Sequence, residues 1–401
     1  MRVLMISDVY FPRINGVSTS IETFRSQLTP LGIETLLIAP RYGSEPDEPG
    51  IFRISARPLP IDPEDRWMSR RAAMQVAKGL SGIDLVHIQT PFVAHRVGIK
   101  LARRWGVPVV STYHTLFEEY FHHYLPYLPA SLLRGLTRRF SGHQCNALDA
   151  LIVPSTAMRD RLLSYGVKTP LTVLPTGIPV SHFSHGDRQG FRQRHGLSED
   201  QPVALYVGRV AHEKNIEFLL DALRWAIPRC PNLLLMITGE GPALPRLQIR
   251  VRAMGLGTRV RFLGYQDRNG ELPDIYAGSD VFVFASRTET QGLVLLEALA
   301  SGLPVVALPA MGTCDILDPG RGSVAAPDDP EGFAGALLGV LNDPARRASL
   351  AQEAKVYAQE WLDSVMATRL AAFYASWVGV NTVEMLARQG TNSPSPCVEF
   401  N

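Results

Sequence analysis

The chain has 401 residues, and 46% of them are hydrophobic, which is enough apolar material for two ordinary domain cores. Its 40 lysines and arginines stand against 38 aspartates and glutamates, and the formal charge of +2 argues against a general nucleic-acid-binding protein. No uninterrupted apolar stretch approaches about 18 residues, and the chain begins directly with a predicted strand, so we expect neither a membrane span nor a signal peptide.

Short apolar runs alternate with helical patterns along the chain, which is typical of βα units and parallel sheets. In the first half we predict strands at residues 3–7, 34–39, 84–88, 108–112, 150–153 and 172–174. In the second half we predict strands at 203–207, 233–238, 260–263, 281–284 and 305–308, and then a helical run from about 350 to 377. Turn residues from Pro175 to Pro179 mark a domain junction. The predicted fold class is α/β, with two doubly wound domains in tandem and a ligand-binding cleft between them.

Two residues at predicted strand ends of the first domain are candidates for ligand contact. Gly16 lies in the loop that links the first strand to its helix, where a glycine allows a substrate or phosphate to approach the backbone closely. Most such loops contain a glycine, so this feature alone is weak. His114 follows the fourth strand and would lie beside the cleft. A lone histidine is more often structural, but this position favours a hydrogen bond to a ligand hydroxyl or the stabilisation of nearby charge.

The first domain also contains a basic segment. Between Arg66 and Arg139 there are 11 basic and 3 acidic residues, an excess that suits anionic lipid headgroups, although solvated helix faces would explain it equally well. Within this segment, residues 129–144 have the spacing of an amphipathic helix, which would lie either in a lipid interface or against the core. Its apolar side would contain Leu132, Leu133, Leu136 and Phe140, and its basic side Arg134 and Arg138.

Two cations follow the first strand of the second domain. Arg209 and Lys214 lie in a strand-end loop, where together they would neutralise a diphosphate and stabilise the charge that grows on it as a bond breaks. Alternatively, Lys214 would pair with Glu213 or Glu217 on the surface. After the next strand, the turn at 239–242 lacks the third glycine of a dinucleotide-binding motif, so it is either a tight loop against a nucleotide or an ordinary turn.

The most informative stretch of the chain begins at Glu289 and ends at Glu297. Gly292 lies where a buried strand gives way to a helix, and the backbone N–H groups of Thr290 to Leu293 would form an anion site at the helix N-terminus. Eight helical residues span about 12 Å, enough to straddle a diphosphate, so a carboxylate on each side suits a nucleotide-sugar. The plainer alternative is that Glu289 caps the helix and that Glu297 is an exposed charge.

The sequence does not indicate a metal site. No pair of aspartates follows a strand in the arrangement that holds a metal-bound nucleotide, and the His122-His123 pair lacks acidic or cysteine partners. The four cysteines are Cys145, Cys230, Cys314 and Cys397. Their wide separation predicts reduced, unpaired thiols in a cytoplasmic protein.

Together these motifs resemble the retaining glycosyltransferases of family 4, which have two Rossmann-like domains in the architecture called GT-B. The similarity covers about residues 1–378. Its most specific part is the glutamate pair, Glu289 and Glu297, followed by the run from Ala298 to Val306. One difference lies in the first loop, where many relatives have two glycines and this chain has Asn15-Gly16.

The resemblance implies a role for each site residue. Arg209 and Lys214 would hold the donor diphosphate, Glu289 would contact hydroxyls of the donor sugar, and Glu297 would contact the ribose. The reaction would retain the anomeric configuration and require neither a metal nor another cofactor. The implied catalytic residues are His114, Arg209, Lys214 and Glu289. The implied donor-binding residues are Gly16, Arg209, Lys214, Glu289, Thr290, Gln291, Gly292, Leu293 and Glu297.

The resemblance also implies a division of labour between the domains. Residues 1–178 would bind the acceptor and residues 179–355 the nucleotide-sugar, in a cleft between two Rossmann-like domains. Residues 356–380 would form helices that pack back toward the first domain, and residues 381–401 would be a disordered tail.

Stretches 87–92 and 113–124 resemble bacterial glycolipid-forming members of the family. We therefore predict a cytoplasmic hexosyltransferase that moves glucose from UDP-glucose to a lipid or lipid-linked hydroxyl and contacts anionic membranes peripherally, with no nucleic-acid partner. The nearest alternative is a GDP-mannose-dependent mannosyltransferase. A nucleotide-sugar epimerase and a catalytically silent nucleotide-binding module are rivals from other classes.

Overall fold

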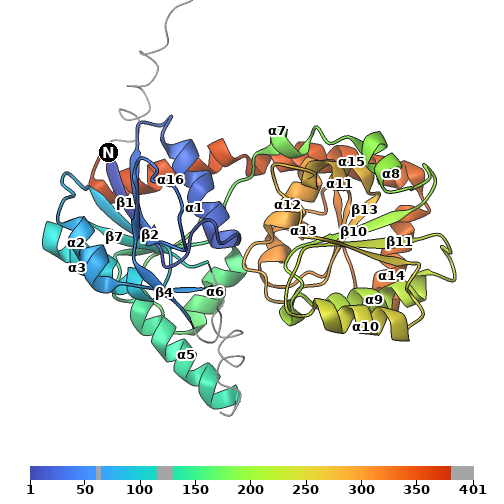
Figure 1. The fold of residues 1–401 in the computed structure, drawn as a ribbon, viewed down its shortest axis with the longest axis horizontal. Coiled ribbons are helices and arrows are strands. Elements are labelled where there is room, and N and C mark those ends of the chain that lie inside the picture. Colours follow the sequence, from blue (N-terminus) through green and yellow to red (C-terminus); the bar gives the residue numbers. More distant parts are fainter. Residues whose placement is uncertain (60–64, 115–129, 381–401) are drawn as a thin grey trace, which may run out of the picture. The chain divides into compact units, whose positions relative to one another are not determined.

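The computed structural model describes residues 1–59, 65–114 and 130–380, except for the side chains of residues 130–134 and 136. These residues form two compact units (Figure 1). The first unit comprises Met1–Pro154, Arg159–Gly177 and the chain from Asp363 onward, and the second comprises Ser155–Met158 and Ile178–Leu362. Several predictions concern parts outside the described residues: the pair His122-His123, the tail at 381–401 with Cys397, and the side chains of Leu132, Leu133, Arg134 and Leu136.

The core of the first unit is a parallel sheet of seven strands in the order β3-β2-β1-β6-β7-β8-β9. The strands are β1 (Arg2–Ile6), β2 (Glu34–Pro40), β3 (Ile51–Ile54), β6 (Leu85–Ile88), β7 (Val109–Thr112), β8 (Ala150–Val153) and β9 (Leu171–Val173). The strands β6, β7 and β8 are buried along their whole length, as expected where helices cover both faces of a parallel sheet. The strand order reverses at β1, which pairs with both β2 and β6, and such switch points are where open α/β sheets bind ligands.

Helices surround this sheet. They are α1 (Gly16–Leu28), α2 (Arg70–Ala77), α3 (Val93–Trp105), α5 (Ala130–Cys145) and α16 (Asp363–Val378), while α6 (Thr156–Ser164) crosses the boundary between the two units along the chain. The antiparallel pair β4 (Ala56–Pro58) and β5 (Arg66–Met68), like β3, is absent from the sequence prediction because these strands are short and lack an alternating apolar pattern.

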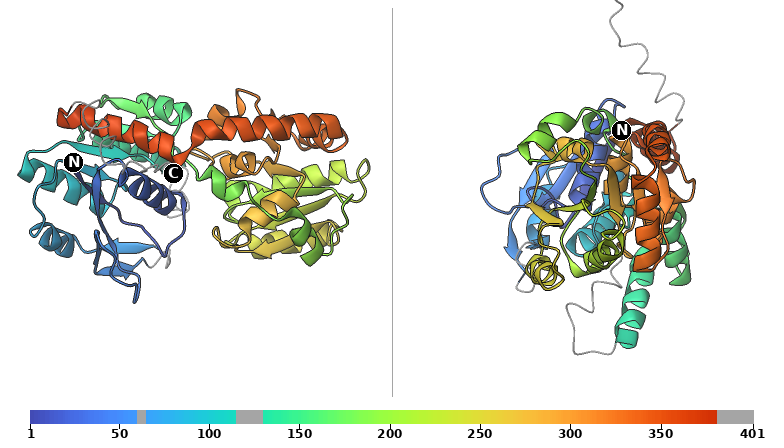
Figure 2. Two further views of the ribbon diagram at one scale, coloured as in Figure 1. Left: turned by 90° about the horizontal axis from the view of Figure 1, so that it is seen from above. Right: turned by 90° about the vertical axis from the view of Figure 1, so that its right-hand side faces the viewer.

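The last helix of the described chain, α16, lies alongside α1 (Figures 1 and 2). Tyr374 of α16 is fully buried, and its hydroxyl lies 2.6 Å from Nδ1 of His87 on β6. The other ring nitrogen of His87 lies 2.8 Å from Oγ1 of Thr112 on β7. The C-terminal helix is thereby hydrogen-bonded to the centre of the first sheet.

The second unit is built on a parallel sheet in the order β12-β11-β10-β13-β14-β15. Its strands are β10 (Val203–Val207), β11 (Leu234–Thr238), β12 (Val260–Gly264), β13 (Val281–Phe284), β14 (Val305–Ala307) and β15 (Ser323–Ala325). Its helices are α7 (Val180–Phe183), α8 (Arg188–Arg194), α9 (Ile216–Ala226), α10 (Leu244–Ala253), α11 (Leu272–Gly278), α12 (Leu293–Ala300), α13 (Cys314–Leu317), α14 (Pro330–Leu341) and α15 (Pro344–Ala358). The chain enters and leaves this unit at adjacent points, since the N–H of Ile178 donates to the carbonyl of Trp361 (2.9 Å). Across the described residues, no helix combines the length and apolar character needed to cross a bilayer.

The buried His87 generates a prediction about pH. Burial lowers the pKa of His87 to about 3, far below the value of about 6.5 in an unfolded chain. Because the unfolded chain then binds the extra proton, His87 should cost the folded state about 1.4 kcal/mol of stability for each pH unit below about pH 6. We expect urea unfolding to show this loss in the wild-type protein and a smaller loss in His87→Gln. Parallel stability curves for the two proteins between pH 7.5 and 5 would contradict this account.

Candidate functional site

The second unit brings Lys214 and Glu289 together. A short 3-10 helix after β10, η1 (His212–Lys214), places the lysine, and the loop after β13 places the glutamate. Since β10 and β13 are parallel neighbours, their carboxyl-end loops meet at one edge of the sheet. Lys214 Nζ forms an ion pair with Glu289 Oε1, and the two side chains are only 16% and 17% exposed. Glu217, a surface alternative, pairs instead with Arg246 and Arg250.

Arg209 lies in the same strand-end loop, five positions before Lys214. Its side chain is exposed, and within the described part of the chain no ion pair involves it. Its backbone is held in place, because the buried Tyr206 hydroxyl donates to the Arg209 carbonyl (3.1 Å). The loop therefore presents one paired and one exposed cation.

The glycine-containing loops after β10 and β11 are hydrogen-bonded to each other at this edge. The N–H of Gly208 donates to the carbonyl of Thr238 (3.0 Å), and the N–H of Val210 donates to that of Glu240 (2.8 Å). Gly239 has φ +127°, and a Cβ there would lie 2.0 Å from the carbonyl oxygen of Gly208. The turn at 239–242 is therefore a tight loop packed against the loop that carries Arg209, which explains its glycines without a ligand.

The helix α12 begins immediately after this edge. Its N-cap residue is Gly292 in the left-handed region (φ 97°), which has no side chain with which to cap the first-turn N–H groups. The alternative in which Glu289 caps this helix is wrong, because the carboxylate pairs with Lys214 and α12 has no side-chain cap. A helix N-terminus flanked by a lysine is a favourable place for an anion.

Glu297 lies inside α12 and is only 4% exposed, so the alternative of a solvated charge is wrong. Its Oε1 accepts from Arg268 Nη2 at 2.8 Å, and its Oε2 accepts from the hydroxyl of Tyr276 at 2.9 Å. The Arg268 guanidinium also lies 5.3 Å from the ring centroid of Phe183. Arg268 is the more exposed partner of this ion pair, with a side chain that is 27% exposed against 5% for that of Glu297.

Sequence reasoning did not identify Arg268, Tyr276 or Gly312. Gly312 follows β14, and its N–H donates to the carbonyl of Glu289 (2.8 Å). A Cβ at Gly312 would lie 2.1 Å from the carbonyl oxygen of Thr290. The backbone of Gly312 therefore packs directly against the Glu289–Thr290 segment and holds it through a hydrogen bond. The sequence offers no signal for this role, because a glycine between a strand and a helix is ordinary.

The first unit contains the other two predicted residues. His114 Nε2 donates to Gln89 Oε1 (2.8 Å), and burial lowers the pKa of His114 to about 4, which keeps the ring neutral near pH 7. His114 lines a small cavity of about 30 Å³. Gly16 opens α1, where a Cβ would meet no other atom of the described chain, and Asn15 caps the helix by accepting from Ser18 N (2.9 Å). Packing within the protein therefore does not require the glycine.

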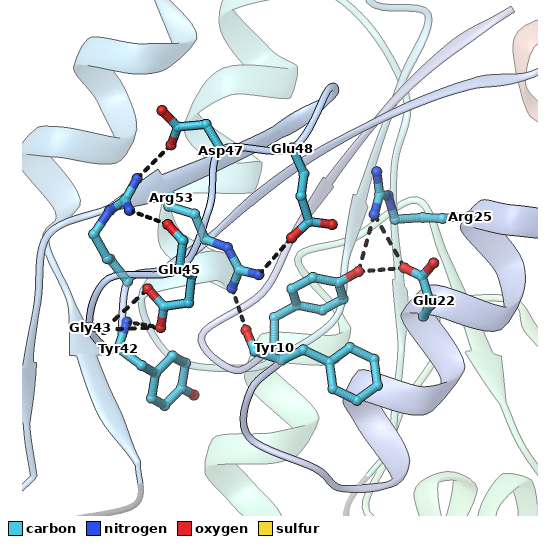
Figure 3. Close-up of polar contacts among 11 residues, drawn as sticks. Tyr10, Glu22, Arg25, Tyr42, Gly43, Glu45, Asp47, Glu48 and Arg53 are labelled. Atoms are coloured by element: carbon cyan, nitrogen blue, oxygen red, sulfur yellow. Dashed lines mark hydrogen bonds and ion pairs between the residues drawn. The ribbon is translucent and has the colours of Figure 1, made fainter. Parts of the chain in front are cut away.

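The loop that leads to Gly16 is anchored by a polar network (Figure 3). Arg53 donates to the carbonyl of Phe11, and its guanidinium lies 5.0 Å from the ring centroid of Tyr10. Tyr10 in turn donates to Glu22 and accepts from Arg25 (3.1 Å). Charged side chains thus hold the β1–α1 loop from both sides.

The structure assembles Arg209, Lys214, Glu289 and the start of α12 at one sheet edge of the second unit, with Glu297 deeper in the same helix. In the first unit, Gly16 is the first residue of α1, and His114 lies just after the end of β7. That both groups face one ligand stays a prediction. The described residues contain no cluster of three or more His, Cys, Asp or Glu side chains arranged to hold a metal ion.

Comparison with known proteins identifies the class. The pattern of the family described as "Glycosyl transferases group 1" matches residues 187–357, and that of "Glycosyltransferase Family 4" matches residues 14–182. The chain is 32% identical over 322 residues to an alpha-monoglucosyldiacylglycerol synthase of Streptococcus pneumoniae, an alignment that covers 77% of this chain and 71% of that protein. It is 29% identical to a GDP-mannose-dependent alpha-mannosyltransferase of Mycobacterium tuberculosis, over 82% of this chain and 84% of that protein.

Solved structures agree on the fold. The structure of Anabaena HepE in complex with UDP and glucose matches 94% of this chain and all of that chain, with a TM-score of 0.77 and 18% identity. The sucrose-phosphate synthase of Thermosynechococcus elongatus also gives a TM-score of 0.77, at 22% identity, over 94% of this chain and 98% of that chain. The protein is a glycosyltransferase with two Rossmann-like domains and the GT-B fold. It belongs to glycosyltransferase family 4, which confirms the predicted family and fold class.

The position of Gly312 yields a prediction for the site. In Gly312→Ala, the new Cβ must displace the Glu289–Thr290 segment, so we expect roughly tenfold weaker binding of UDP or GDP in calorimetric titration and a loss of about 1–3 kcal/mol of stability. The matched control is Gly257→Ala, since Gly257 is exposed and a Cβ there would meet no other atom of the described chain. Unchanged nucleotide binding in Gly312→Ala would show that this glycine does not support the site.

Proposed function

We propose that this glycosyltransferase moves glucose from UDP-glucose to the hydroxyl of a lipid or lipid-linked acceptor with retention of configuration. The observation that carries the proposal is the Lys214–Glu289 ion pair beside the uncapped N-terminus of α12. At this edge of the sheet a cation, a carboxylate and the backbone N–H donors of a helix N-terminus lie close together. A sugar diphosphate needs these three groups, for its phosphates, its hydroxyls and its leaving oxygen respectively.

The proposed chemistry follows from these groups. Arg209 and Lys214 neutralise the diphosphate, and the first-turn N–H groups of α12 bind a phosphate oxygen. Glu289 orients the sugar through its hydroxyls. The bond between the anomeric carbon and the phosphate oxygen breaks while the acceptor oxygen bonds to that carbon from the same face, and the acceptor proton passes to the leaving phosphate oxygen. The products are UDP and a glucosylated lipid, and the proposal includes no metal.

Glu297 and Arg268 belong to the proposed nucleotide subsite. The carboxylate is already held by Arg268 and Tyr276, so its position is set before the ligand arrives. A carboxylate held in this way accepts hydrogen bonds from ribose hydroxyls without first losing its own rotational freedom.

The lipid acceptor and the site of action are also proposals. The similarity to an alpha-monoglucosyldiacylglycerol synthase supports a diacylglycerol-type acceptor. The basic segment of the first unit supports peripheral contact with the cytoplasmic face of a membrane, where anionic lipids attract lysine and arginine.

The donor base distinguishes the proposal from its nearest alternative, since the chain is also similar to GDP-mannose-dependent enzymes. A thermal-shift panel with UDP-glucose, UDP-galactose and GDP-mannose separates them, because a ligand that binds only the folded state raises the apparent stability. The protein is then incubated with the stabilising donor and diacylglycerol in mixed micelles. We expect an α-linked glucolipid and UDP. Isomerised donor without acceptor would indicate an epimerase, and binding without any turnover would indicate a silent module.

Lys214 provides the sharpest variant. In Lys214→Ala, the cation that faces the developing negative charge is lost, so we expect kcat to fall by about 100-fold or more. The control is Arg224→Ala, since Arg224 is an exposed cation of the same unit for which the described residues provide no ion pair. Circular dichroism and thermal melting check that both variants fold. A turnover rate near that of the wild type in folded Lys214→Ala would contradict the assigned role.

A further inference from the structure

The first unit has a groove of about 550 Å³, formed by residues of α2, α3 and α5 and the turn after α5. Its lining residues are Arg70, His95, Arg96, Ile99, Lys100, Arg103, Phe140, His143, Gln144 and Ala147. None of these described lining residues is acidic. The volume is far larger than that of the cavity beside His114 and lies within the range of small-ligand sites.

Four cations converge on this groove. Arg96, Lys100 and Arg103 are spaced four and three positions apart on α3, which places them on one face of the helix, and Arg70 approaches from the start of α2. All four are exposed, and within the described residues none of them forms an ion pair. Like charges on one helix face repel each other, so the cluster lowers stability unless an anion binds there.

The groove also has apolar lining residues. Phe140 of α5 is 44% exposed, an unusual position for a phenyl ring, and Ile99 lies on the α3 side. His95 and Gln144 belong to both this groove and the cavity of His114. Their contacts fix this shared wall, since His95 Nε2 lies 3.1 Å from the carbonyl oxygen of Gln144, and Gln144 Nε2 donates to the carbonyl of Pro91 at 2.7 Å.

We propose that this groove is a binding site for the phosphate of an anionic glycerophospholipid, with the phosphate on the cations of α2 and α3 and the glycerol and upper acyl chain against Phe140 and Ile99. This inference deepens the proposed membrane contact and rests on it. A specific site of this kind differs from a general electrostatic attraction between a basic surface and an anionic membrane, because particular arginines bind one headgroup while neighbouring arginines do not. A lipid fits better than a free anion because an exposed phenyl ring next to four cations matches a molecule with both a charged and an apolar part.

The sequence offers a matched pair of triple variants. Arg70→Gln, Arg96→Gln and Arg103→Gln remove three groove cations. Arg71→Gln, Arg104→Gln and Arg139→Gln remove three exposed arginines from α2, α3 and α5, and none of these three side chains lines the groove. Both triples change the net charge by the same amount. A third protein carries Arg70→Lys, Arg96→Lys and Arg103→Lys, which changes the same three side chains but keeps their positive charge. If the lysine triple binds vesicles and the glutamine triple does not, the lost charge and not misfolding explains the weaker binding.

The full-length proteins are sedimented with phosphatidylcholine vesicles that contain phosphatidylglycerol as the minority lipid. We expect the groove triple to bind on the order of 100-fold more weakly than the wild type, the control triple only severalfold more weakly, and the lysine triple close to the wild type. Equal losses in the two glutamine triples would show diffuse attraction and overturn the proposal. So would unchanged binding by the groove triple.

Two further experiments distinguish a lipid phosphate from other sources of phosphate. Inorganic phosphate at constant ionic strength should not release the wild-type protein, and release by millimolar phosphate would assign the groove to a free anion instead. If the wild-type protein binds duplex DNA and the groove triple loses that binding to the same extent as vesicle binding, the groove is a nucleic-acid site instead. The assay contains neither donor nor acceptor, so absent turnover would refute the proposed glycosyl transfer and not the groove. Equal losses in the two glutamine triples would refute the groove alone, and a wild-type protein that does not bind the vesicles would refute both the groove and the proposed membrane contact.

Discussion

The site of the second unit depends on the close approach of backbone loops at one edge of a parallel sheet. A Cβ at Gly239 would lie 2.0 Å from the carbonyl oxygen of Gly208, and a Cβ at Gly312 would lie 2.1 Å from that of Thr290. Only glycines allow these contacts, and hydrogen bonds between the loops satisfy polar backbone groups that the approach buries. Because the loops after β10 and β13 are fixed in this way, Lys214 and Glu289 form a partly buried ion pair although 75 positions separate them.

The charges of the protein fall into two groups with different functions. Buried carboxylates are paired or hydrogen-bonded: Glu297 binds Arg268 and Tyr276, while Asp8 accepts from the N–H groups of Val93 and Ala94 at the start of α3. Burial raises the pKa of Asp8 to about 6, because its effect outweighs that of these hydrogen bonds, which lower the pKa. The exposed cations, Arg209 and those of the groove, have no such partners in the described structure. Partners thus fix the buried carboxylates, whereas the exposed cations are the groups that the two proposals assign to phosphate ligands.

The pattern of apolar runs predicted most of the two parallel sheets, because strands that are buried on both faces are continuous hydrophobic runs. It missed β3 and β15, whose strands are short and contain polar residues. The glutamate pair pointed to the edge of the second sheet where Lys214 and Glu289 meet beside the start of α12, since a loop, a glycine and a helix follow one another along the chain. The partners of those glutamates could not be predicted, because Arg268 and Gly312 come from loops after other strands and contact them only across the sheet edge.

The order of apolar and polar residues thus determined by itself the fold class, and the motifs that resemble family 4 determined the family, because both depend on local spacing along the chain. The same motifs supplied the candidate residues of the site. Tertiary structure alone decided which of those residues meet. It paired Lys214 with Glu289, buried Glu297 beneath Arg268, and placed the cations of α2 and α3 around one groove. The physical reason is that ion pairs and grooves depend on distances between segments far apart in the chain, which sheet order and helix packing set and local spacing does not.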